Sequence, residues 1–308
     1  MDHQFLYSFT KNIPDTLHNQ TIIIGNFDGV HIGHQQLIDQ AKCATPERNV
    51  VILTFRPHPK VIFHHDLEYF MISTPQQKYK RLKEEGVSAV VEIPFDREFA
   101  KLSGEKFISM LINMLQPKNI YVGEDFCFGN QRTGNAELLS NLSQAYGYKL
   151  HVIKKFHNTQ NICYSSSAIR EHIKQGHISA ANQLLGYNWI IEGKVIHGDK
   201  RGRSIGFPTA NIDISPYLLP KPGVYCVKVH INQQTYRAVT NIGYRPTFKT
   251  KKPLLEVHIF EFSEDIYGQF IQVEFLDFLR AEKKFNSLQD LTSQIQEDCI
   301  QAKDRLSI

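Results

Sequence analysis

Two histidines and three glycines share the stretch Gly25-Asn26-Phe27-Asp28-Gly29-Val30-His31-Ile32-Gly33-His34. An apolar run at residues 22–24 precedes it, and residues 35–42 follow with helical apolar spacing, which predicts a strand, a turn and a helix. At such a junction, free backbone N–H groups and the positive end of the helix dipole face one crevice. Gly29 and Gly33 have no Cβ, so the backbone can come close to a ligand. The stretch therefore predicts a phosphate site, with the imidazoles of His31 and His34 beside it.

The histidine pair also fits other kinds of site. Two histidines three residues apart could be half of a zinc site, but no third ligand lies nearby in the sequence and neither has a glutamate beside it. Both could equally be ordinary surface residues. The glycine spacing matches neither a dinucleotide-binding fingerprint nor a P-loop. The position at a strand-to-helix turn favours phosphate binding over these alternatives.

The bulk composition indicates a folded protein of two domains. A chain of 308 residues is long enough for two cores, and it has neither a low-complexity tract, nor a membrane-length apolar run, nor a signal-peptide pattern in its first ten residues. The five scattered cysteines favour reduced thiols, and hence a cytoplasmic location, over a disulfide framework. The net charge of +4 has no long basic run behind it. We therefore expect no nucleic-acid or membrane partner, and a monomer or weak homo-oligomer.

The two halves of the chain have different patterns. In the first, strand-like runs (residues 21–24, 50–55, 89–93, 120–122 and 150–153) alternate with helical patterns (residues 35–42, 76–85, 104–115, 136–146, 167–174 and 178–185). This alternation is typical of a parallel sheet covered by helices, with the ligand at the carboxyl ends of the strands. The second half has short strand-like runs (residues 189–196, 223–229, 236–242, 254–260 and 271–275), which predict a small antiparallel barrel.

The predicted domains are residues 1–186 and 187–308, and a helix closes the second. This helix begins with a capping pattern, Ser287 followed by Asp290. Its apolar stripe of Leu288, Leu291, Ile295 and Cys299 should pack on the barrel.

Three more loops of the first half follow predicted strands. They are Phe55-Arg56-Pro57-His58-Pro59, Gly123-Glu124-Asp125-Phe126-Cys127-Phe128-Gly129 and Tyr164-Ser165-Ser166-Ser167-Ala168-Ile169-Arg170. Hydroxyls and an arginine at a helix start suit the phosphates of a nucleotide, because these donors need not move. The simpler alternatives are a serine N-cap, a rigid Pro-His-Pro turn and a turn-forming Asp125.

The second half opens with a glycine-rich, basic loop at residues 198–206, followed by Phe207-Pro208-Thr209-Ala210-Asn211. Glycine amides can hold a phosphate, and oxygens of Thr209 and Asn211 can bind Mg²⁺. A flexible surface loop is the alternative. Glu256 lies on the strand face opposite Leu255 and Val257, which by itself predicts a solvent-facing glutamate.

The stretch from Gly25 to His34 resembles the first signature of the nucleotidylyltransferase superfamily, in the form found in bacterial bifunctional riboflavin kinase/FMN adenylyltransferases (FAD synthetases). The His-x-Gly-His element alone gives only a reaction class, because other adenylyl- and cytidylyltransferases share it. The Pro-His-Pro loop and residues 123–134 are similar to the flavin-holding loops, and residues 165–170 to the second nucleotide signature. Ser167 stands where the family more often has threonine, and Glu124 precedes Asp125.

Residues 202–211 are similar to the riboflavin kinase signature. Further matches follow at residues 223–225, 241–248, 255–260 and 267–268, so the resemblance covers nearly the whole chain. It implies a Rossmann-like nucleotidylyltransferase domain with a parallel sheet, then a small antiparallel β-barrel with a terminal helix.

The resemblance implies a bifunctional enzyme of flavin cofactor biosynthesis. It phosphorylates riboflavin with ATP to FMN and ADP, and adenylylates FMN with ATP to FAD and pyrophosphate. Mg²⁺ is required with ATP, and the flavins are substrate and product rather than prosthetic groups. Adenylyl transfer needs no covalent intermediate, because positioning and fixed donors can neutralise the transition-state charge.

The resemblance also assigns roles to residues of this sequence. For adenylyl transfer, the catalytic residues are His31, His34, Ser166 and Arg170; ATP contacts are Gly25, Phe27, Asp28, Gly29, Gly33, Ser165 and Ser167; flavin contacts are Pro57, His58, Pro59, Asp125, Phe126, Phe128 and Arg132. For the kinase, ATP contacts are Gly202, Arg203, Gly206, Pro208 and Thr209; Thr209 and Asn211 bind Mg²⁺; Glu256 takes the ribityl proton; Arg280 lies near the flavin, or else is an ordinary surface arginine.

Two rival functions are a different nucleotidylyltransferase and a flavin-binding delivery or sensor protein without turnover. The first leaves the barrel signature unexplained. The second is disfavoured by the presence of His31, His34, Thr209, Asn211 and Glu256.

Overall fold

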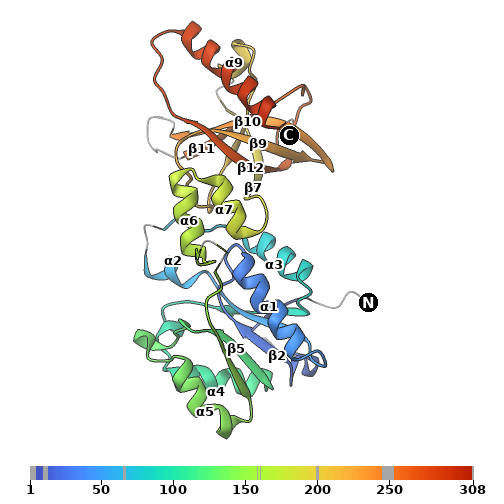
Figure 1. Ribbon diagram of the computed structural model, residues 1–308, viewed down its shortest axis with the longest axis vertical. Coiled ribbons are helices and arrows are strands. Elements are labelled where there is room, and N and C mark those ends of the chain that lie inside the picture. The colour runs from blue at the N-terminus through green and yellow to red at the C-terminus, as the bar shows by residue number, and fades with distance from the viewer. Residues whose placement is uncertain are drawn as a thin grey trace. The chain divides into compact units, whose positions relative to one another are not determined.

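The structure is a computed structural model that describes residues 5–9, 13–64, 67–157, 159, 161–198, 201–244 and 253–306 (Figure 1). The chain folds into two compact units. The first consists of Met1–Glu68 and Thr74–Ser165, and the second of Tyr69–Ser73 and Ser166–Ile308. Each unit therefore draws on two separate stretches of the chain.

The first unit contains a six-stranded parallel sheet, which confirms the prediction. In spatial order its strands are β1 (Leu6–Ser8), β4 (Ala89–Pro94), β3 (Val50–Arg56), β2 (Thr21–Ile24), β5 (Asn119–Gly123) and β6 (Lys149–Ile153). Its helices are α1 (Ile32–Ala44), α2 (Pro59–Phe63), α3 (Pro75–Glu84), α4 (Gly104–Leu115) and α5 (Ala136–Tyr146), with 3-10 turns at Asp15–Leu17, Phe99–Lys101 and Asn130–Arg132. From β2 the chain adds β3 and β4 on one side and β5 and β6 on the other. Sheets of this kind bind ligands beyond the carboxyl ends of the strands at such a point.

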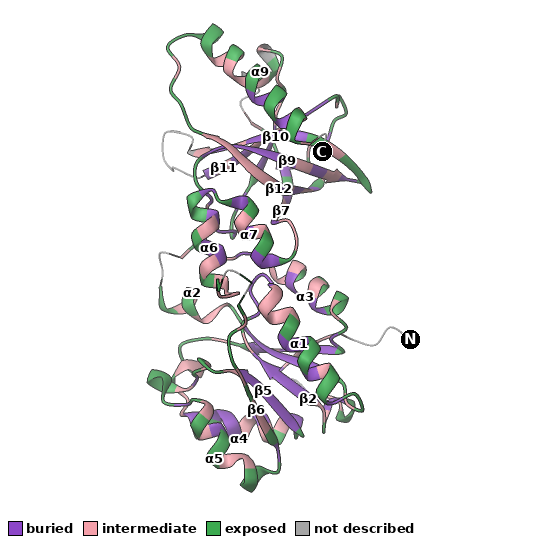
Figure 2. Ribbon diagram, viewed as in Figure 1, coloured by how far each residue is buried: buried purple, intermediate pink, exposed green. Residues whose placement is uncertain are grey.

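Two hydrophobic clusters cover the two faces of this sheet, because successive strand residues point to opposite faces. On one face, Ile24 packs in a cluster with Leu111 of α4. On the other, Ile23 packs with Ile38 of α1 and Leu82 of α3. Figure 2 shows β2 and β5 as buried strands. Both faces are thus covered by helices, and the sheet edges and loops remain for a ligand.

The second unit contains a closed, six-stranded antiparallel barrel, as predicted. Around the barrel its strands are β10 (Gln234–Tyr244), β11 (Pro253–Ile259), β8 (Ala210–Asp213), β7 (Ile190–Ile196), β12 (Phe270–Ala281) and β9 (Gly223–Ile231). Its helices are α6 (Ser166–Gln175), α7 (Ile178–Leu185), α8 (Arg201–Ser204) and α9 (Leu288–Arg305).

Helix α9 begins and packs largely as its sequence predicts. Ser287 Oγ accepts a hydrogen bond from the backbone N–H of Asp290 at 3.1 Å, which confirms the cap. Ile295 and Cys299 pack against the barrel strands. Leu288 was predicted in the same stripe but is 64% exposed. The prediction for Leu288 was wrong, because the residues of α9 that contact the barrel lie in its later turns.

Helices α6 and α7 belong to the same compact unit as the barrel, although the predicted domain boundary is near residue 186. The segment Tyr69–Ser73 belongs to this unit as well. Trp189 is buried and donates its Nε1–H to the carbonyl oxygen of Ile72 at 2.8 Å. The carbonyl oxygen of Met71 accepts a bond from Leu218 N at 2.8 Å. A buried indole N–H requires an acceptor, and this segment supplies it.

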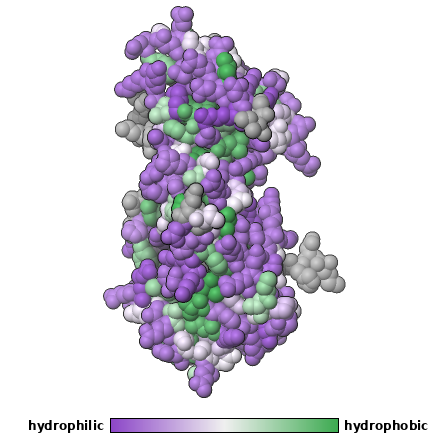
Figure 3. Space-filling view, in the orientation of Figure 1, coloured by the Kyte–Doolittle hydropathy of each residue, from purple (hydrophilic) through white to green (hydrophobic). Residues whose placement is uncertain are grey.

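The visible face in Figure 3 is mostly hydrophilic, with hydrophobic side chains in smaller groups. Exposed large hydrophobic side chains occur in both units, and scattered exposure of this kind is normal. Among the described residues, no helix is both long and apolar enough to cross a bilayer.

Candidate active sites

The nucleotide loop, residues 25–31, joins the carboxyl end of β2 to the start of α1, where His31 is the N-cap residue. Phe27 (φ +53°), Gly29 (φ +83°) and Val30 (φ +36°) all have left-handed backbone. This conformation suits glycine and is unfavourable for phenylalanine and above all for β-branched valine. The predicted strand, turn and helix are confirmed, and the turn is held in a strained form.

Gly33 serves packing between protein segments. A Cβ at this position would lie 3.0 Å from Cβ of Tyr164 and 3.2 Å from Cε1 of His31. Because glycine has no side chain, residue 164, directly before the second nucleotide signature, can lie against the first turn of α1. The contact of Gly33 with ATP stays a prediction.

The imidazoles of His31, which ends the loop, and His34, in the first turn of α1, stack on each other with ring centroids 3.7 Å apart and an angle of 21°. The ring of Phe27 lies against His34, with centroids 4.8 Å apart. Burial, the nearby His31 and the charge of Lys78 hold the pKa of His34 well below its ordinary value. Its Nδ1 is buried without a hydrogen-bond partner among the described residues. His34 is therefore a neutral imidazole at neutral pH, with one ring nitrogen that the protein leaves unused.

Lys78 of α3 was missed in the sequence. Its side chain is 6% exposed, and Nζ donates to Thr54 Oγ1 at 3.1 Å and to the Asn26 carbonyl oxygen at 3.4 Å. Burial lowers the pKa of Lys78 to about 8. The surrounding polar residues predict an exposed lysine. The one available signal was its spacing, because Lys78 lies one helical turn before the buried Leu82.

An aromatic cluster connects the two predicted flavin loops of the first unit. Phe126 and Phe128 stack with centroids 5.3 Å apart, and Phe128 contacts Phe107 at 5.1 Å. Ring contacts continue through Phe99, Phe55 and Phe95 to Phe63. Phe63 ends α2 and is 58% exposed. The loops after β3 and β5 are therefore linked by packed rings, and their contact with a flavin stays a prediction.

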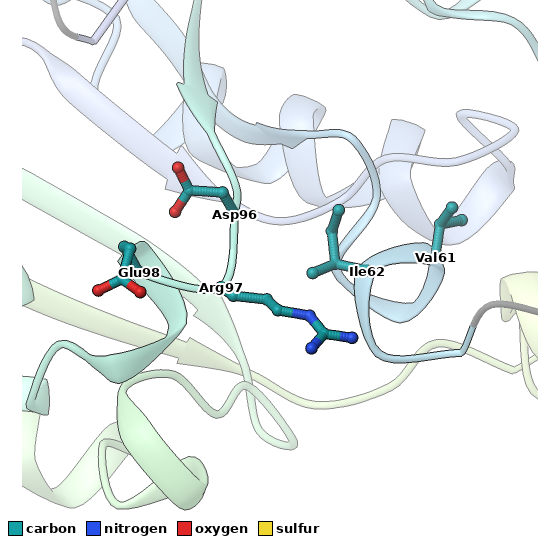
Figure 4. A pocket seen from close by; sticks show the side chains of 5 residues that line it. All are labelled: Val61, Ile62, Asp96, Arg97 and Glu98. Carbon is teal, nitrogen blue, oxygen red and sulfur yellow. The ribbon is translucent and has the colours of Figure 1, made fainter.

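A hollow of about 410 Å³ lies beside α2 (Figure 4), lined by Val61, Ile62, Asp96, Arg97 and Glu98. In Figure 4 the side chain of Arg97 extends toward Ile62. The hollow thus combines an apolar wall with a guanidinium, close in sequence to the Pro-His-Pro loop. None of these five residues was predicted to line a site, because neither a pair of apolar residues nor a charged turn indicates a cavity in the sequence.

Other predicted flavin residues have local partners. His58 Nδ1 accepts a bond from Lys60 N at 3.2 Å and so caps α2, which Pro59 begins. Asp125 pairs with Lys155 at 3.0 Å, and this contact raises the pKa of Lys155. Arg132 is exposed in the 3-10 turn that follows Phe128. The structure thus shows local roles for His58 and Asp125 beside their predicted ones.

The second nucleotide signature spans both compact units, since the division falls between Ser165 and Ser166. Ser166 opens α6. Arg170 is 8% exposed, and its Nε donates to the Phe70 carbonyl oxygen at 3.1 Å. Its guanidinium also stacks on the ring of Phe70 at 3.9 Å. Arg170 therefore fixes the segment Tyr69–Ser73, and its action on phosphates stays a prediction.

The barrel strands place a polar row around Glu256. In the strand register, Glu256 of β11 lies opposite Asn211 of β8 on one side and Asn241 of β10 on the other. The neighbours Leu255 and Val257 are fully buried, whereas Glu256 is half-buried. The alternation predicted for this strand is confirmed, and it places Glu256 between two asparagines.

Glycines bring the glycine-rich loop of residues 198–206 close to this row. A Cβ at Gly198 would clash with the side-chain amide of Asn211, and one at Gly202 with the carbonyl oxygen of Phe207. Gly206 has φ +89°. The Pro208 carbonyl oxygen contacts His258 Nδ1 at 2.8 Å, which ties the loop to β11. Residues 199–200 of the predicted glycine-rich loop and residues 245–248 of the predicted family match lie outside the described residues.

Arg280 forms a bidentate ion pair with Asp298 of α9. Its Nε and Nη2 donate to the two carboxylate oxygens at 2.8 and 2.7 Å. The Asp298 side chain is only 4% exposed. This ion pair joins α9 to β12, and the nearness of Arg280 to a flavin stays a prediction.

Family models cover almost the entire chain. A riboflavin kinase model matches residues 185–306, and an FAD synthetase model matches residues 13–168. The protein from Bacillus subtilis described as a bifunctional riboflavin kinase/FMN adenylyltransferase is 38% identical over 282 residues, which is 89% of each chain. The chain belongs to the bifunctional riboflavin kinase/FMN adenylyltransferase family.

Two further proteins are similar to this chain over nearly its whole length. The Haemophilus influenzae protein of the same description is 39% identical and covers 95% of this chain and 96% of its own. A solved structure from Streptococcus pneumoniae, described as a macrolide-efflux protein, has a TM-score of 0.86 at 32% identity, over 97% of this chain and 99% of its own. The function implied by the sequence motifs is thereby confirmed: the chain is a riboflavin kinase and an FMN adenylyltransferase.

Proposed function

We propose that residues 1–186 carry the FMN adenylyltransferase site and residues 187–308 the riboflavin kinase site. The ranges matched by the two family models support this division. The substrates are ATP with riboflavin in the kinase reaction and ATP with FMN in the second reaction. Because α6 and α7 group with the barrel, the adenylyltransferase domain in this proposal includes helices from both compact units.

In the adenylyltransferase reaction, the FMN phosphate attacks the α-phosphorus of ATP and pyrophosphate leaves. His31 and His34 bind the triphosphate together with the loop residues Gly25, Phe27, Asp28, Gly29 and Gly33, and Ser165, Ser166, Ser167 and Arg170 serve its outer phosphates. The flavin lies along the aromatic cluster near Pro57, His58 and Pro59 and the loop of Asp125, Phe126, Phe128 and Arg132, where the exposed Phe63 offers a ring face. A neutral His34 suits this role, because a hydrogen bond to phosphate does not require it to change charge.

In the kinase reaction, Glu256 accepts the proton of the terminal ribityl hydroxyl as that oxygen attacks the γ-phosphorus. The loop of Gly202, Arg203, Gly206, Pro208 and Thr209 holds ATP. The Thr209 hydroxyl and the Asn211 amide oxygen fit Mg²⁺, which takes hard oxygen ligands and often shares them with substrate phosphates. Bound Mg²⁺ would neutralise charge on the transferred phosphoryl group. Arg280 acts near the flavin by fixing α9.

The observation that carries the proposal is the pair of stacked imidazoles at the start of α1. Incubation of pure protein with riboflavin and Mg-ATP, followed by separation of the flavins, tests both sites. His31→Ala should lower FAD formation roughly 10²–10³-fold while FMN still accumulates. Glu256→Gln should abolish FMN formation but spare FAD formation from supplied FMN.

Matched variants control for folding. His18→Ala and Glu261→Gln change the same residue types outside the predicted sites, and both should keep the two activities. Normal FAD synthesis by His31→Ala would reject the proposed adenylyltransferase site. Bound but unconverted riboflavin in the wild-type protein would indicate a flavin carrier instead.

The cysteines support a reducing compartment. Cys43, Cys127, Cys163, Cys226 and Cys299 are all free thiols. We therefore place the enzyme in the cytoplasm. That it acts as a monomer or weak homo-oligomer stays a prediction.

A further inference from the structure

One hydrogen-bonded triangle ties three elements of the first unit together. Lys78 of α3 donates to Thr54 Oγ1 of β3 at 3.1 Å and to the Asn26 carbonyl oxygen of the nucleotide loop at 3.4 Å. Thr54 Oγ1 donates to the same carbonyl oxygen at 3.2 Å. Thr54 is fully buried and Lys78 is 6% exposed. Two donors from two elements therefore fix one backbone oxygen.

The fixed oxygen directly precedes the strained part of the loop. Phe27 and Val30 have φ of +53° and +36°, which residues with a Cβ rarely adopt. Such conformations persist only where the surroundings impose them. Lys78 and Thr54 are placed to do so, because a peptide whose carbonyl oxygen is held by two bonds cannot rotate freely.

The loop conformation sets the ring stack of the candidate site. Phe27 contacts His34 at 4.8 Å between centroids, and His34 stacks on His31 at 3.7 Å. A change at the Asn26 carbonyl therefore moves Phe27 first and the two imidazoles with it.

Burying the positive charge of Lys78 costs free energy, because the ammonium loses its hydration. This cost argues against a purely structural role for a lysine at this position. Its ammonium makes no carboxylate ion pair within 4 Å in the described part of the chain. Asp28 and Glu92 act on it from a longer distance, and Arg56 opposes them. An apolar side chain of the same length would fill this buried space without the desolvation cost.

We propose that Lys78 is a positioning residue for adenylyl transfer, which holds the Asn26 carbonyl so that the imidazoles of His31 and His34 meet the triphosphate in reactive geometry. This inference rests on the proposed adenylyltransferase site. Lys78 acts through the loop and touches no reacting atom.

The test compares Lys78→Met, Thr54→Val and the double variant in the full chain. Misplacement by about 1 Å can cost on the order of 100-fold, so Lys78→Met should lower kcat for FAD formation about 10- to 100-fold. The KM for Mg-ATP should change less, because the lost term acts mainly in the transition state. Thr54→Val should act in the same direction, and the double variant should be no worse than Lys78→Met alone, since both changes remove one triangle.

Controls separate this effect from misfolding. Lys80→Met alters the exposed neighbouring lysine on the same helix and should leave FAD formation unchanged. FMN formation by the barrel should stay normal in every variant. The imidazole NMR signals of His31 and His34 should shift in Lys78→Met and Thr54→Val but not in Lys80→Met.

A folded Lys78→Met protein with wild-type kcat for FAD overturns the inference, as do additive effects in the double variant. If Lys78→Met fails to fold, Thr54→Val decides: an unchanged kcat overturns the inference and a lower one supports it. A separate result, normal FAD synthesis by His31→Ala, would reject the proposed adenylyltransferase site itself.

Discussion

Burial sets the protonation of two side chains at the nucleotide loop. Burial, His31 and Lys78 keep the pKa of His34 well below its usual range, so this imidazole is neutral at neutral pH. Lys78, with a pKa of about 8, is still mostly charged there. A mostly charged ammonium and a neutral imidazole therefore lie beside the same loop at neutral pH.

The lowered pKa of Lys78 predicts a pH-dependent stability. Its pKa falls from 10.5 to about 8 on folding, so between these values the unfolded chain binds more protons and the free energy of unfolding rises with pH. The full shift corresponds to roughly 3 kcal/mol. Lys78→Met lacks this rise, so its stability relative to wild type should decline from pH 8 to pH 10.5. Denaturant titrations of both proteins at several pH values measure the free energies of unfolding. A difference in free energy of unfolding that stays constant with pH would contradict the lowered pKa of Lys78.

Single residues show where sequence reasoning stops. His31, His34 and Glu256 could be proposed as site residues from the sequence because their residue types carry chemistry in recognisable motifs. Lys78 could not, because its burial depends on the packing of α3 against strands far away in the sequence. The sequence suggests that Gly33 lets a ligand come close to the backbone. In the folded chain the nearest neighbour of Gly33 is Tyr164, a contact that the sequence does not reveal.

At the scale of elements, strong hydrophobic periodicity predicted every parallel strand except β1, every barrel strand except β8, and the longer helices. Short elements were missed: β1 has three residues, β8 and α8 four each and α2 five, too few to show a period. The grouping of α6 and α7 with the barrel was also out of reach, because an amphipathic helix does not reveal which surface its apolar face will cover.

The contact between α9 and β12 should depend on the Arg280–Asp298 pair. Removing one partner of a buried pair leaves the other uncompensated, so Asp298→Ala should destabilise the barrel unit by about 3 kcal/mol. Glu261→Ala removes the exposed pair with Lys303 on the same helix, and it should cost less than about 1 kcal/mol. Thermal unfolding of the barrel unit measures the stability of both variants. An equal loss of stability in the two would contradict a larger contribution from the Arg280–Asp298 pair.

At the scale of the whole molecule, each compact unit has hydrophobic clusters of its own. FMN links the two reactions, because it is the product of the kinase reaction and a substrate of the adenylyltransferase reaction. We expect two damaged chains to complement each other. A mixture of His31→Ala and Glu256→Gln proteins should convert riboflavin to FAD, because FMN released by the first can be adenylylated by the second. Chromatography of the flavins measures this, and FMN accumulation without FAD in the mixture would show that free FMN does not reach the adenylyltransferase site.

The indole of Trp189 takes its acceptor from a segment more than a hundred positions earlier in the chain. That segment is enclosed on both sides by sequence belonging to the other unit. No single cut of the polypeptide can therefore release both halves intact, and a fragment starting after residue 186 would lack the carbonyl that satisfies its largest fully buried side chain. A chimera that takes the barrel unit from a relative would thus also need the relative's segment corresponding to Tyr69–Ser73.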